Sequence, residues 1–357
     1  MFRISAAFGA AALSLAMMGA GPGTATAADY PDPQEGDYVI EDFTFHTGET
    51  VPEMKVHYRT IGDPDGEPVL LIHGTNGTGA SFLTDGFAGA MFGPGQPLDA
   101  QTYFIILPDV IGAGDSSKPS DGMRAEFPRY NYKDMVDAQY KLVTDHLGID
   151  HLHLVMGNSM GGMITWEWGI MHPDFMDALV PMASLPAAMS GRNWMMRRML
   201  VDSVRSDPAW QDGNYTEQPP NLAIAQVWFG IATNGGNLRL QEIGSTREKA
   251  DAYVDDQLAK AKAKDANDTM YQWDASRDFD PSADLDKIEA PVLAINSADD
   301  ERNPTELGIL EAAMERQPLI TTFIIPESRE TRGHGTTGSQ AALYAEPLKA
   351  FLDGLPE

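Results

Sequence analysis

The sequence predicts an α/β fold: an open, mostly parallel β-sheet with helices on both faces and a helical insertion. Three observations indicate this fold. Short, almost entirely apolar segments alternate with helical patterns, the first strand patterns alternate apolar and polar residues, and no convincing strand pattern occurs between residues 185 and 285. Short apolar runs are typical of strands that are buried on both faces of a parallel sheet. A chain of 357 residues is long enough for one such domain with an insertion.

Eight segments carry the strand patterns. The first two are separated by Gly48 and Pro52, and we expect them to form an antiparallel edge of the sheet. The expected strands are residues 38–45, 54–60, 68–72, 103–107, 152–156, 178–182, 291–295 and 321–325. Helical patterns cover residues 132–147, 161–171, 194–203, 222–231 and 246–264.

Residues 1–28 have the composition of a secretory signal peptide. Arg3 is followed by an apolar stretch over residues 4–18 and then by small residues. We expect cleavage near Ala27 or Ala28 and a secreted or periplasmic protein. The apolar stretch is shorter than the roughly 20 residues of a spanning helix, so no membrane span is expected. The alternative is a retained N-terminal anchor.

Charge and cysteine content restrict the class of protein. The formal net charge is −27 and the chain has no cysteine. An acidic surface repels nucleic acids and anionic membranes, so we expect neither as a partner. The absence of cysteine excludes disulfides and a lipid-modified N-terminal cysteine. The histidines are scattered along the chain, so we expect no metal site and no cofactor.

The insertion divides the expected domain into two parts. The core comprises residues 29–184 and 286–357, and residues 185–285 form a helical lid over the carboxyl edge of the sheet, where ligands of such folds bind. The lid is rich in methionine and tryptophan, which favours either an apolar substrate pocket or ordinary helix packing. These residues include Trp194, Met195, Met196, Met199 and Trp228.

The most specific motif is Gly-Asn-Ser-Met-Gly-Gly at residues 157–162, directly after an expected strand and before a helical pattern. This is the context of a nucleophile elbow, a sharp turn that holds a serine in a strained backbone conformation. Gly157 and Gly161 let the strand and the helix approach each other. We therefore predict that Ser159 is a nucleophile. The alternative is a glycine-rich turn in which Ser159 only caps the helix.

A serine nucleophile needs a base within hydrogen-bond reach and a third group that orients this base. In folds with this elbow, the chain order is serine, acid, histidine. Of the eight histidines only His334 follows the last expected strand, where it lies between Gly333 and Gly335. We predict that His334 is the general base. An exposed loop histidine is the alternative.

The acid is expected after the strand at residues 291–295. Asp299 and Asp300 compete for this role, and Glu301 is a third candidate. Asp300 is favoured because it lies four residues before Pro304, a spacing common after this strand of the fold. The acid would fix the tautomer of the histidine and stabilise its charged form. A carboxylate without that role would complement the dipole of the following helix.

Acyl transfer also requires N–H donors for the developing oxyanion. The Met160 N–H follows the nucleophile directly and is the first expected donor. The second is expected in the loop after residues 68–72, where the Thr75 N–H is favoured. His73, in the same loop, is expected to support the loop rather than to react.

Further segments carry a family resemblance. They are residues 71–74, 76–77, 134–139, 147–149, 157–162 and 209–215. Together they resemble the homoserine O-acetyltransferase family of the α/β-hydrolase superfamily, and the stretch around residues 210–220 is specific to that family. The resemblance implies an α/β-hydrolase fold with an eight-stranded sheet, a serine acyl-enzyme, a helical lid and a homodimer formed through the lid.

Two positions depart from what the resemblance implies for an amino-acid acceptor. In that family an aspartate follows the catalytic histidine and a lid arginine pairs with the acceptor carboxylate, whereas this chain has Gly335 and Gln226. Glutamine cannot clamp a carboxylate through two parallel bonds as arginine does. The signal peptide would also send the chain to a compartment where acetyl-CoA is not expected.

Without a held acceptor, water is the default second nucleophile for an acyl-enzyme. We therefore predict a hydrolase of small carboxylic esters or lactones, with Trp194, Gln226 and Trp228 contributing to the substrate pocket. An O-acyltransferase with another donor or acceptor is the first alternative. The others are a noncatalytic protein on the same fold and an enzyme that cleaves amides or thioesters.

Overall fold

The computed structural model describes residues 30–356, so the expected signal peptide and its cleavage point lie outside the described residues. The strands are β1 (Gln34–Thr44), β2 (Thr50–Ile61), β3 (Glu67–Ile72), β4 (Tyr103–Pro108), β5 (Leu152–Asn158), β6 (Met176–Met182), β7 (Val292–Ser297) and β8 (Ile320–Ile325). The helices are α1 (Ala88–Met91), α2 (Tyr132–Lys141), α3 (Met160–Met171), α4 (Gly191–Arg205), α5 (Pro220–Thr233), α6 (Asn237–Ile243), α7 (Arg247–Lys262), α8 (Ala266–Asp274), α9 (Ile309–Arg316), α10 (Thr336–Ser339) and α11 (Ala345–Leu352).

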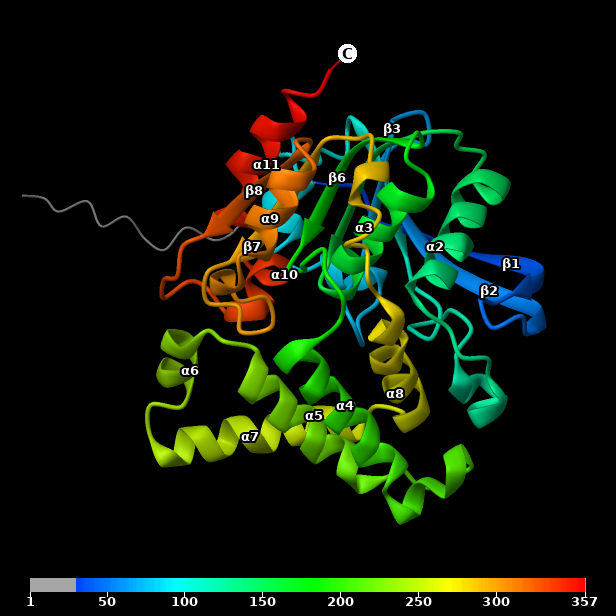
Figure 1. The fold of residues 1–357 in the computed structure, drawn as a ribbon, viewed down its shortest axis with the longest axis vertical. Coiled ribbons are helices and arrows are strands. Elements are labelled where there is room, and N and C mark those ends of the chain that lie inside the picture. Colours follow the sequence, from blue (N-terminus) through cyan, green and yellow to red (C-terminus); the bar gives the residue numbers. More distant parts are fainter. Residues whose placement is uncertain (1–29, 357) are drawn as a thin grey trace, which may run out of the picture.

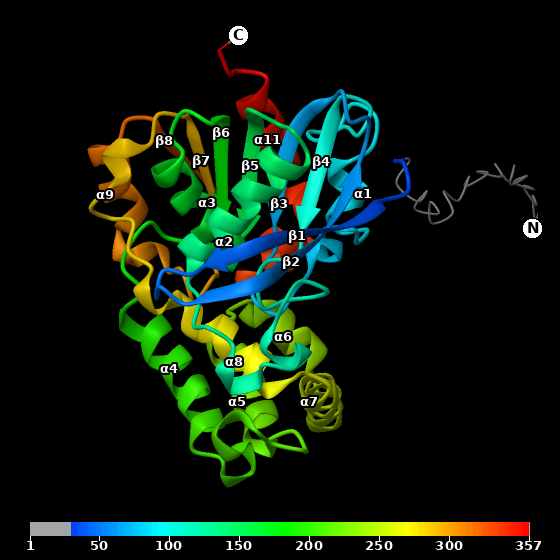
Figure 2. The same cartoon turned by 90° about the vertical axis from the view of Figure 1, so that its right-hand side faces the viewer.

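The strands form one sheet in the order β1-β2-β4-β3-β5-β6-β7-β8 (Figure 1). The pairs β1–β2 and β2–β4 are antiparallel, and every other pair is parallel. The long hairpin of β1 and β2 crosses the direction of the central strands at one edge (Figure 2). The predicted fold class and the antiparallel edge are therefore confirmed.

The central strands are buried on both faces, as their apolar sequences predict. In β3, Leu70 and Ile72 belong to the apolar cluster that contains side chains of α2 and α3, whereas Val69 and Leu71 belong to the cluster of α1 and α11. Successive side chains of a strand point to opposite faces, so an entirely apolar strand needs a helical layer on each face. Each fully buried side chain of this size stabilises the fold by roughly 1.5–3 kcal/mol.

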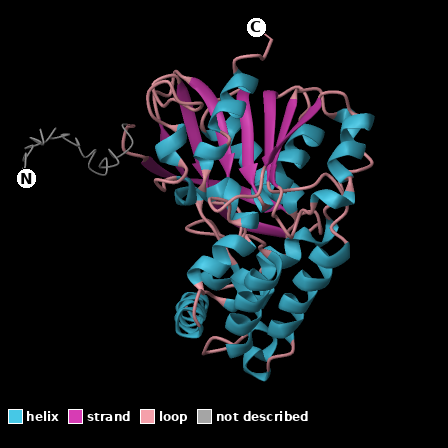
Figure 3. Cartoon of the chain, turned by 90° about the vertical axis from the view of Figure 1, so that its left-hand side faces the viewer, coloured by secondary structure: helices cyan, strands magenta, loops and turns pink. Residues whose placement is uncertain are grey.

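Helices α4 to α8 form a separate layer beyond one end of the sheet (Figure 1). This layer is entirely helical, and it lies within the range expected for the insertion (Figure 3). It has an apolar cluster of its own, formed by Leu200, Val201, Val204, Tyr215, Leu222, Phe229, Ala266, Met270 and Trp273. The lid is therefore a packed unit rather than a loose segment.

No helix within residues 30–356 is both long enough and apolar enough to cross a lipid bilayer.

Candidate active site

Ser159 lies at the sharp turn from β5 into α3. Its backbone has φ 59° and ψ −110°, a conformation that is costly for a residue with a side chain. Its N–H donates to the carbonyl oxygen of Met182 at 2.9 Å. A methyl group on Gly161 would lie 1.9 Å from the carbonyl oxygen of Ile72, and one on Gly157 would lie 2.2 Å from that of Gly161. Only glycine at both positions lets α3 approach the sheet this closely.

The hydroxyl group of Ser159 makes no capping bond to α3, although the residue occupies the N-cap position. Its Oγ instead lies 2.7 Å from His334 Nε2, and His334 Nδ1 lies 2.8 Å from Asp300 Oδ2. All three side chains are buried. The two distances fit a tautomer in which Nδ1–H donates to the carboxylate and Nε2 accepts the serine proton.

Asp300 is held in place by donors other than the imidazole. Its Oδ1 accepts the N–H of Arg302 at 2.8 Å, and its Oδ2 accepts a proton of Asn303 Nδ2 at 2.9 Å. The Asn303 amide also donates to the carbonyl oxygen of Ala183 at 2.8 Å. Backbone and amide donors therefore fix the carboxylate in the orientation in which it meets His334.

The other two candidate acids lie elsewhere. The Oδ2 of Asp299 accepts from Thr331 Oγ1 at 2.8 Å and from the Gly333 N–H at 3.2 Å. Glu301 forms an ion pair with Arg192 near the surface. The structure thus places Asp300 against the histidine, while Asp299 holds the loop on which that histidine lies.

The charges around the imidazole favour a neutral base beside an ionised acid. Burial lowers the pKa of His334, Asp300 raises it, and Arg302 and Arg197 lower it, so that the pKa lies below its usual value. Burial alone would raise the pKa of Asp300, but the charge of His334 and hydrogen bonds from His334, Asn303 and the Arg302 N–H lower it overall. His334 can therefore accept a proton from the serine near neutral pH.

The loop after β3 passes directly beside the nucleophile. A methyl group on Gly74 would lie 3.4 Å from Ser159 Cβ. Thr75 follows in this loop, and Met160 opens α3, whose first N–H groups have no acceptor within the helix. The two expected oxyanion donors thus belong to segments that lie next to Ser159.

His73 supports this loop from within the core. It is fully buried, its Nδ1–H donates to the carbonyl oxygen of Gly74 at 2.8 Å, and its Nε2 accepts the Val110 N–H at 3.1 Å. Both ring nitrogens are occupied, so His73 has no free nitrogen for proton transfer.

The lid is bonded to both loops of the site. Gln272 of α8 accepts the Asn76 N–H at 2.8 Å in the loop after β3. The carbonyl oxygen of Asn234, at the end of α5, accepts the His334 N–H at 2.6 Å. The Asn234 amide also donates to the carbonyl oxygen of Arg332 at 2.8 Å. The lid therefore takes part in positioning the catalytic loops.

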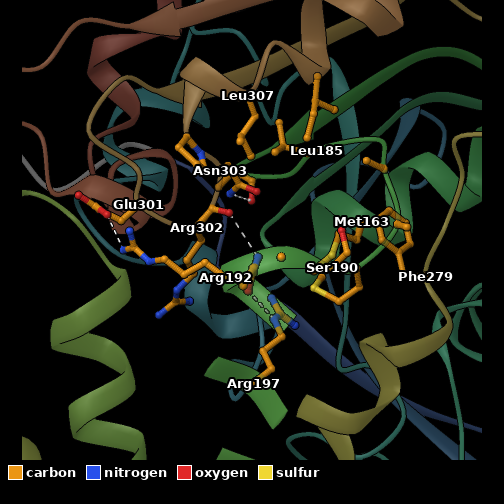
Figure 4. Close-up of a pocket in the computed structure, with 18 of the residues that line it drawn as sticks. Met163, Leu185, Ser190, Arg192, Arg197, Phe279, Glu301, Arg302, Asn303 and Leu307 are labelled. Carbon is orange, nitrogen blue, oxygen red and sulfur yellow. Dashed lines mark hydrogen bonds and ion pairs between the residues drawn. The ribbon is translucent and has the colours of Figure 1, made fainter. Parts of the chain in front are cut away.

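A cavity of about 500 Å³ opens beside His334, between the start of α4 and the loop after β7. Met163, Leu185 and Phe279 give it an apolar wall, and Arg197 and Arg302 line it with cationic groups (Figure 4).

Arg197 and Arg302 were not predicted as site residues from the sequence. A signal for Arg197 was nevertheless present, because it precedes Leu200, Val201 and Val204 at the i, i+3, i+4, i+7 spacing of the buried face of α4. An arginine on such a face is a candidate functional residue, since arginine is rarely buried without a partner.

Trp194, Gln226 and Trp228 do not line the cavity beside His334, and their contribution to a substrate pocket stays a prediction. Gln226 lines a separate cavity of about 160 Å³ between α5 and α7. Trp228 is 60% exposed, and Trp194 lines neither cavity. The reason for Trp228 is that α5 turns Leu222 and Phe229 toward the core of the lid, which directs the neighbouring tryptophan outward.

Large apolar side chains on α4 and α5 are exposed. They are Met195, Met199, Ile224, Trp228 and Ile231. A homodimer formed through the lid would cover such side chains, and it stays a prediction.

One group among residues 30–356 has the spacing of a metal site, which the scattered histidines did not reveal. A ring nitrogen of His57 and carboxylate oxygens of Asp109 and Asp115 lie within 4.8 Å of one another. Asp109 already accepts from Arg59 Nη1 at 3.1 Å and from the Gly79 N–H at 2.7 Å. Through these bonds Asp109 holds the end of the loop after β3.

Comparison with known proteins agrees with this geometry. Residues 67–323 match the model of the α/β-hydrolase fold family. The homoserine O-acetyltransferase of Carboxydothermus hydrogenoformans is 31% identical over 360 residues, which cover 87% of this chain and 93% of that protein. The homoserine O-acetyltransferase of Haloferax prahovense is 29% identical, with 89% of each chain covered.

Solved structures of a hydrolase and of a transferase share the fold. An acetylester hydrolase from Corynebacterium glutamicum superposes with a TM-score of 0.78 at 20% identity, covering 90% of this chain and 96% of that one. The homoserine O-acetyltransferase from Bacillus anthracis gives 0.77 at 20% identity, with 91% and 99% covered. At this level of identity the likeness concerns the fold alone.

Proposed function

The chain belongs to the α/β-hydrolase family and, within it, to the homoserine O-acetyltransferase group, and from this premise we propose that it is a serine hydrolase of carboxylic esters or lactones. The nucleophile is Ser159, the general base is His334 and the acid is Asp300. The observation that carries the proposal is the hydrogen-bonded chain from Ser159 Oγ through both ring nitrogens of His334 to Asp300.

In the proposed reaction, Ser159 Oγ attacks the carbonyl carbon of the ester as its proton passes to His334 Nε2. The N–H groups of Met160 and Thr75 stabilise the oxyanion of the tetrahedral intermediate. The intermediate then collapses, the C–O bond to the alcohol breaks, and the alcohol leaves with the proton from His334. Water then attacks the acyl-enzyme and gives a proton to His334, the C–O bond to Ser159 breaks, the carboxylic acid leaves, and Ser159 Oγ takes the proton back from His334. Asp300 stabilises the imidazolium in both halves.

Two positions support water as the acceptor. Gly335, next to the base, has no side chain, and a methyl group there would come no closer than 3.9 Å to its neighbours. Gln226 lies in the separate cavity between α5 and α7. Neither position offers a charge for an amino-acid acceptor beside His334. Export by residues 1–28, which belongs to the proposal, would also separate the enzyme from acetyl-CoA.

O-Acyl transfer is the second candidate. It is favoured by the relative that is 31% identical over most of both chains and is named a homoserine O-acetyltransferase. Both reactions pass through an acyl-enzyme on Ser159, and they differ in the acyl donor and in the second acceptor.

The test is an assay of p-nitrophenyl esters of graded acyl length with wild type and Ser159→Ala, each with and without homoserine and acetyl-CoA. Ser245→Ala, which changes an exposed serine of the lid, is the matched control. The proposal predicts p-nitrophenol release that requires Ser159 and does not respond to homoserine. Ser159-dependent O-acetylhomoserine formation without hydrolysis would contradict it and establish the transferase.

A further inference from the structure

Two arginines in the cavity beside His334 form no ion pair within the part of the chain that the structure describes. Arg197 is 1% exposed, its Nε donates to Asn193 Oδ1 at 2.8 Å, and its Nη1 has no hydrogen-bond partner within residues 30–356. Arg302 is partly buried, and its Nε donates to Thr233 Oγ1 at 3.1 Å. Both partners are neutral. Burial of a guanidinium without a counter-charge is unfavourable.

The two cations lie against the same pair of aromatic rings. The guanidinium of Arg197 is 4.9 Å from the ring centroid of Trp273, and that of Arg302 is 4.6 Å from the centroid of Phe229. These two rings pack edge to face, 4.7 Å apart. Contacts with ring faces compensate a buried cation only in part, and Nη1 of Arg197 still lacks a hydrogen-bond partner within residues 30–356.

Other arginines nearby show that pairing is the usual state in this chain. Arg192, in the wall of the same cavity, forms an ion pair with Glu301, and Arg198 forms one with Asp202 at 2.7 Å. The chain has 52 acidic and only 25 basic residues, so carboxylates are abundant. Two arginines that line one cavity and form no ion pair within residues 30–356 are therefore unusual here.

The electrostatic effect of the two arginines extends to the base. Burial and the charge of Arg197 lower the pKa of Arg302 to about 9, although the charge of Asp300 acts in the opposite direction. Burial also lowers the pKa of Arg197, and the neighbouring hydroxyl of Tyr132 offsets this in part. After burial, the charges of Arg302 and Arg197 both contribute to the lowered pKa of His334. Because Arg197, Arg302 and His334 line the same cavity, an anion bound by the two arginines would lie near the base.

We propose that Arg197 and Arg302 bind a carboxylate group of the substrate. The natural substrate is then an ester with a free carboxylate, such as a monoester of a dicarboxylic acid or an acylated hydroxy acid. Planar guanidinium groups match the two oxygens of a carboxylate. A cavity of about 500 Å³ with His334 on its wall accommodates a small acid, and its apolar wall suits the carbon chain. This inference rests on the proposed hydrolase function.

The kinetic test compares charged and neutral esters of matched size. One pair is the p-nitrophenyl monoester of glutaric acid and p-nitrophenyl pentanoate, and the other is 3-acetoxypropanoate and 3-acetoxypropanamide. The wild type should favour the charged member of at least one pair by roughly 10- to 100-fold in kcat/KM, the range expected for charge-assisted hydrogen bonds. Arg197→Met and Arg302→Met should abolish this preference, and Arg198→Met should retain it.

If the neutral member is cleaved as fast as the charged one in both pairs, in a reaction that needs Ser159, the carboxylate site is contradicted and the hydrolase stands.

A binding test distinguishes the carboxylate site from the hydrolase function, because binding can be measured without turnover. Sodium glutarate at constant ionic strength should raise the Tm of the Ser159→Ala protein, glutaramide should not, and the Arg197→Met substitution should remove the effect. Arg197→Met should also raise the Tm of the free protein, since it replaces an unpaired buried cation with an apolar side chain. Glutarate binding without hydrolysis of any ester would keep the site and contradict the hydrolase. A lower Tm together with no glutarate effect would show that Arg197 is only structural.

Discussion

The backbone N–H of His334 donates a hydrogen bond to the carbonyl oxygen of Asn234, 2.6 Å away at the end of lid helix α5. The base is thus held both by the core, through Asp300, and by the lid. Gln272, in lid helix α8, binds the loop after β3 in the same way. Because catalysis requires a precise arrangement of these groups, the packing of the lid contributes to activity and not only to access.

The amide side chain of Asn234 gives a direct test of this contribution. Asn234→Ala removes the bond to the Arg332 carbonyl oxygen but keeps the backbone bond to His334. The loss should cost about 0.5–1.5 kcal/mol, and it should lower kcat on p-nitrophenyl acetate by about threefold to tenfold. Asn221→Ala, an exposed position of the same helix, should leave kcat unchanged. If both variants have the same kcat as the wild type, the side chain of Asn234 does not help to position His334, and the proposed contribution of the lid to activity is contradicted.

The two neighbouring aspartates should respond differently to the same substitution. Asp300→Asn keeps the shape of the acid but removes the charge that fixes the His334 tautomer, so kcat should fall by about 10⁴-fold, as in other serine triads. Asp299→Asn should lower kcat by less than about tenfold and reduce the free energy of unfolding by about 1–3 kcal/mol, because its bonds hold Thr331 and Gly333. Steady-state kinetics and urea unfolding of both variants test this. A larger loss of kcat in Asp299→Asn than in Asp300→Asn would identify Asp299 as the acid.

The pH profile should reflect the lowered pKa of His334. The base acts only when it is neutral, so kcat/KM should rise with pH and reach half of its maximum below pH 6.5, the usual value for histidine. Arg302→Met removes a positive charge that disfavours the protonated imidazole, so the half-maximum should move to higher pH. Arg198→Met is the control, and its profile should match the wild type. A half-maximum above pH 7 in the wild type would contradict the lowered pKa of His334.

The elbow should tolerate no side chain at Gly161. In Gly161→Ala the new methyl group would lie 1.9 Å from the carbonyl oxygen of Ile72, so strand and helix must separate. We expect a loss of at least about 2–3 kcal/mol of stability, in the range of overpacked cores. Gly89→Ala is the matched control, because nothing lies within 4 Å of its new methyl group. Thermal unfolding of both variants measures this difference. Similar Tm values would contradict the expected loss of stability in Gly161→Ala.

The strands and the elbow could be predicted because their signals are local. The central strands are apolar throughout. The strand β1 begins four residues earlier than predicted, in a polar stretch without periodic signal, and β2 begins at Thr50, so that Pro52 lies within the strand and not between the two strands. Ser159 and His334 were recognisable from the glycines around them and from their order in the chain. The structure brings them to within hydrogen-bond distance, together with the favoured acid Asp300.

Other features depend on tertiary contacts that no local pattern contains. Which of Asp299 and Asp300 faces the base depends on donors from distant segments, such as Thr331. Helix α5 carries apolar residues on all sides, so the sequence could not indicate that Phe229 would be buried and Trp228 exposed. Arg197 differs from these cases, because the helical spacing of its apolar neighbours already placed it on the buried face of α4.

The most direct test of the central claim is intact-mass spectrometry of the enzyme, quenched with acid during turnover of p-nitrophenyl acetate, followed by peptide mapping. We expect one acetyl group on Ser159 that disappears in water at a rate independent of homoserine, and that accumulates in Asp300→Asn if deacylation becomes slow. An acetyl group on another residue, no adduct on Ser159 under any quench time, or an adduct that persists until homoserine is added would contradict the central claim.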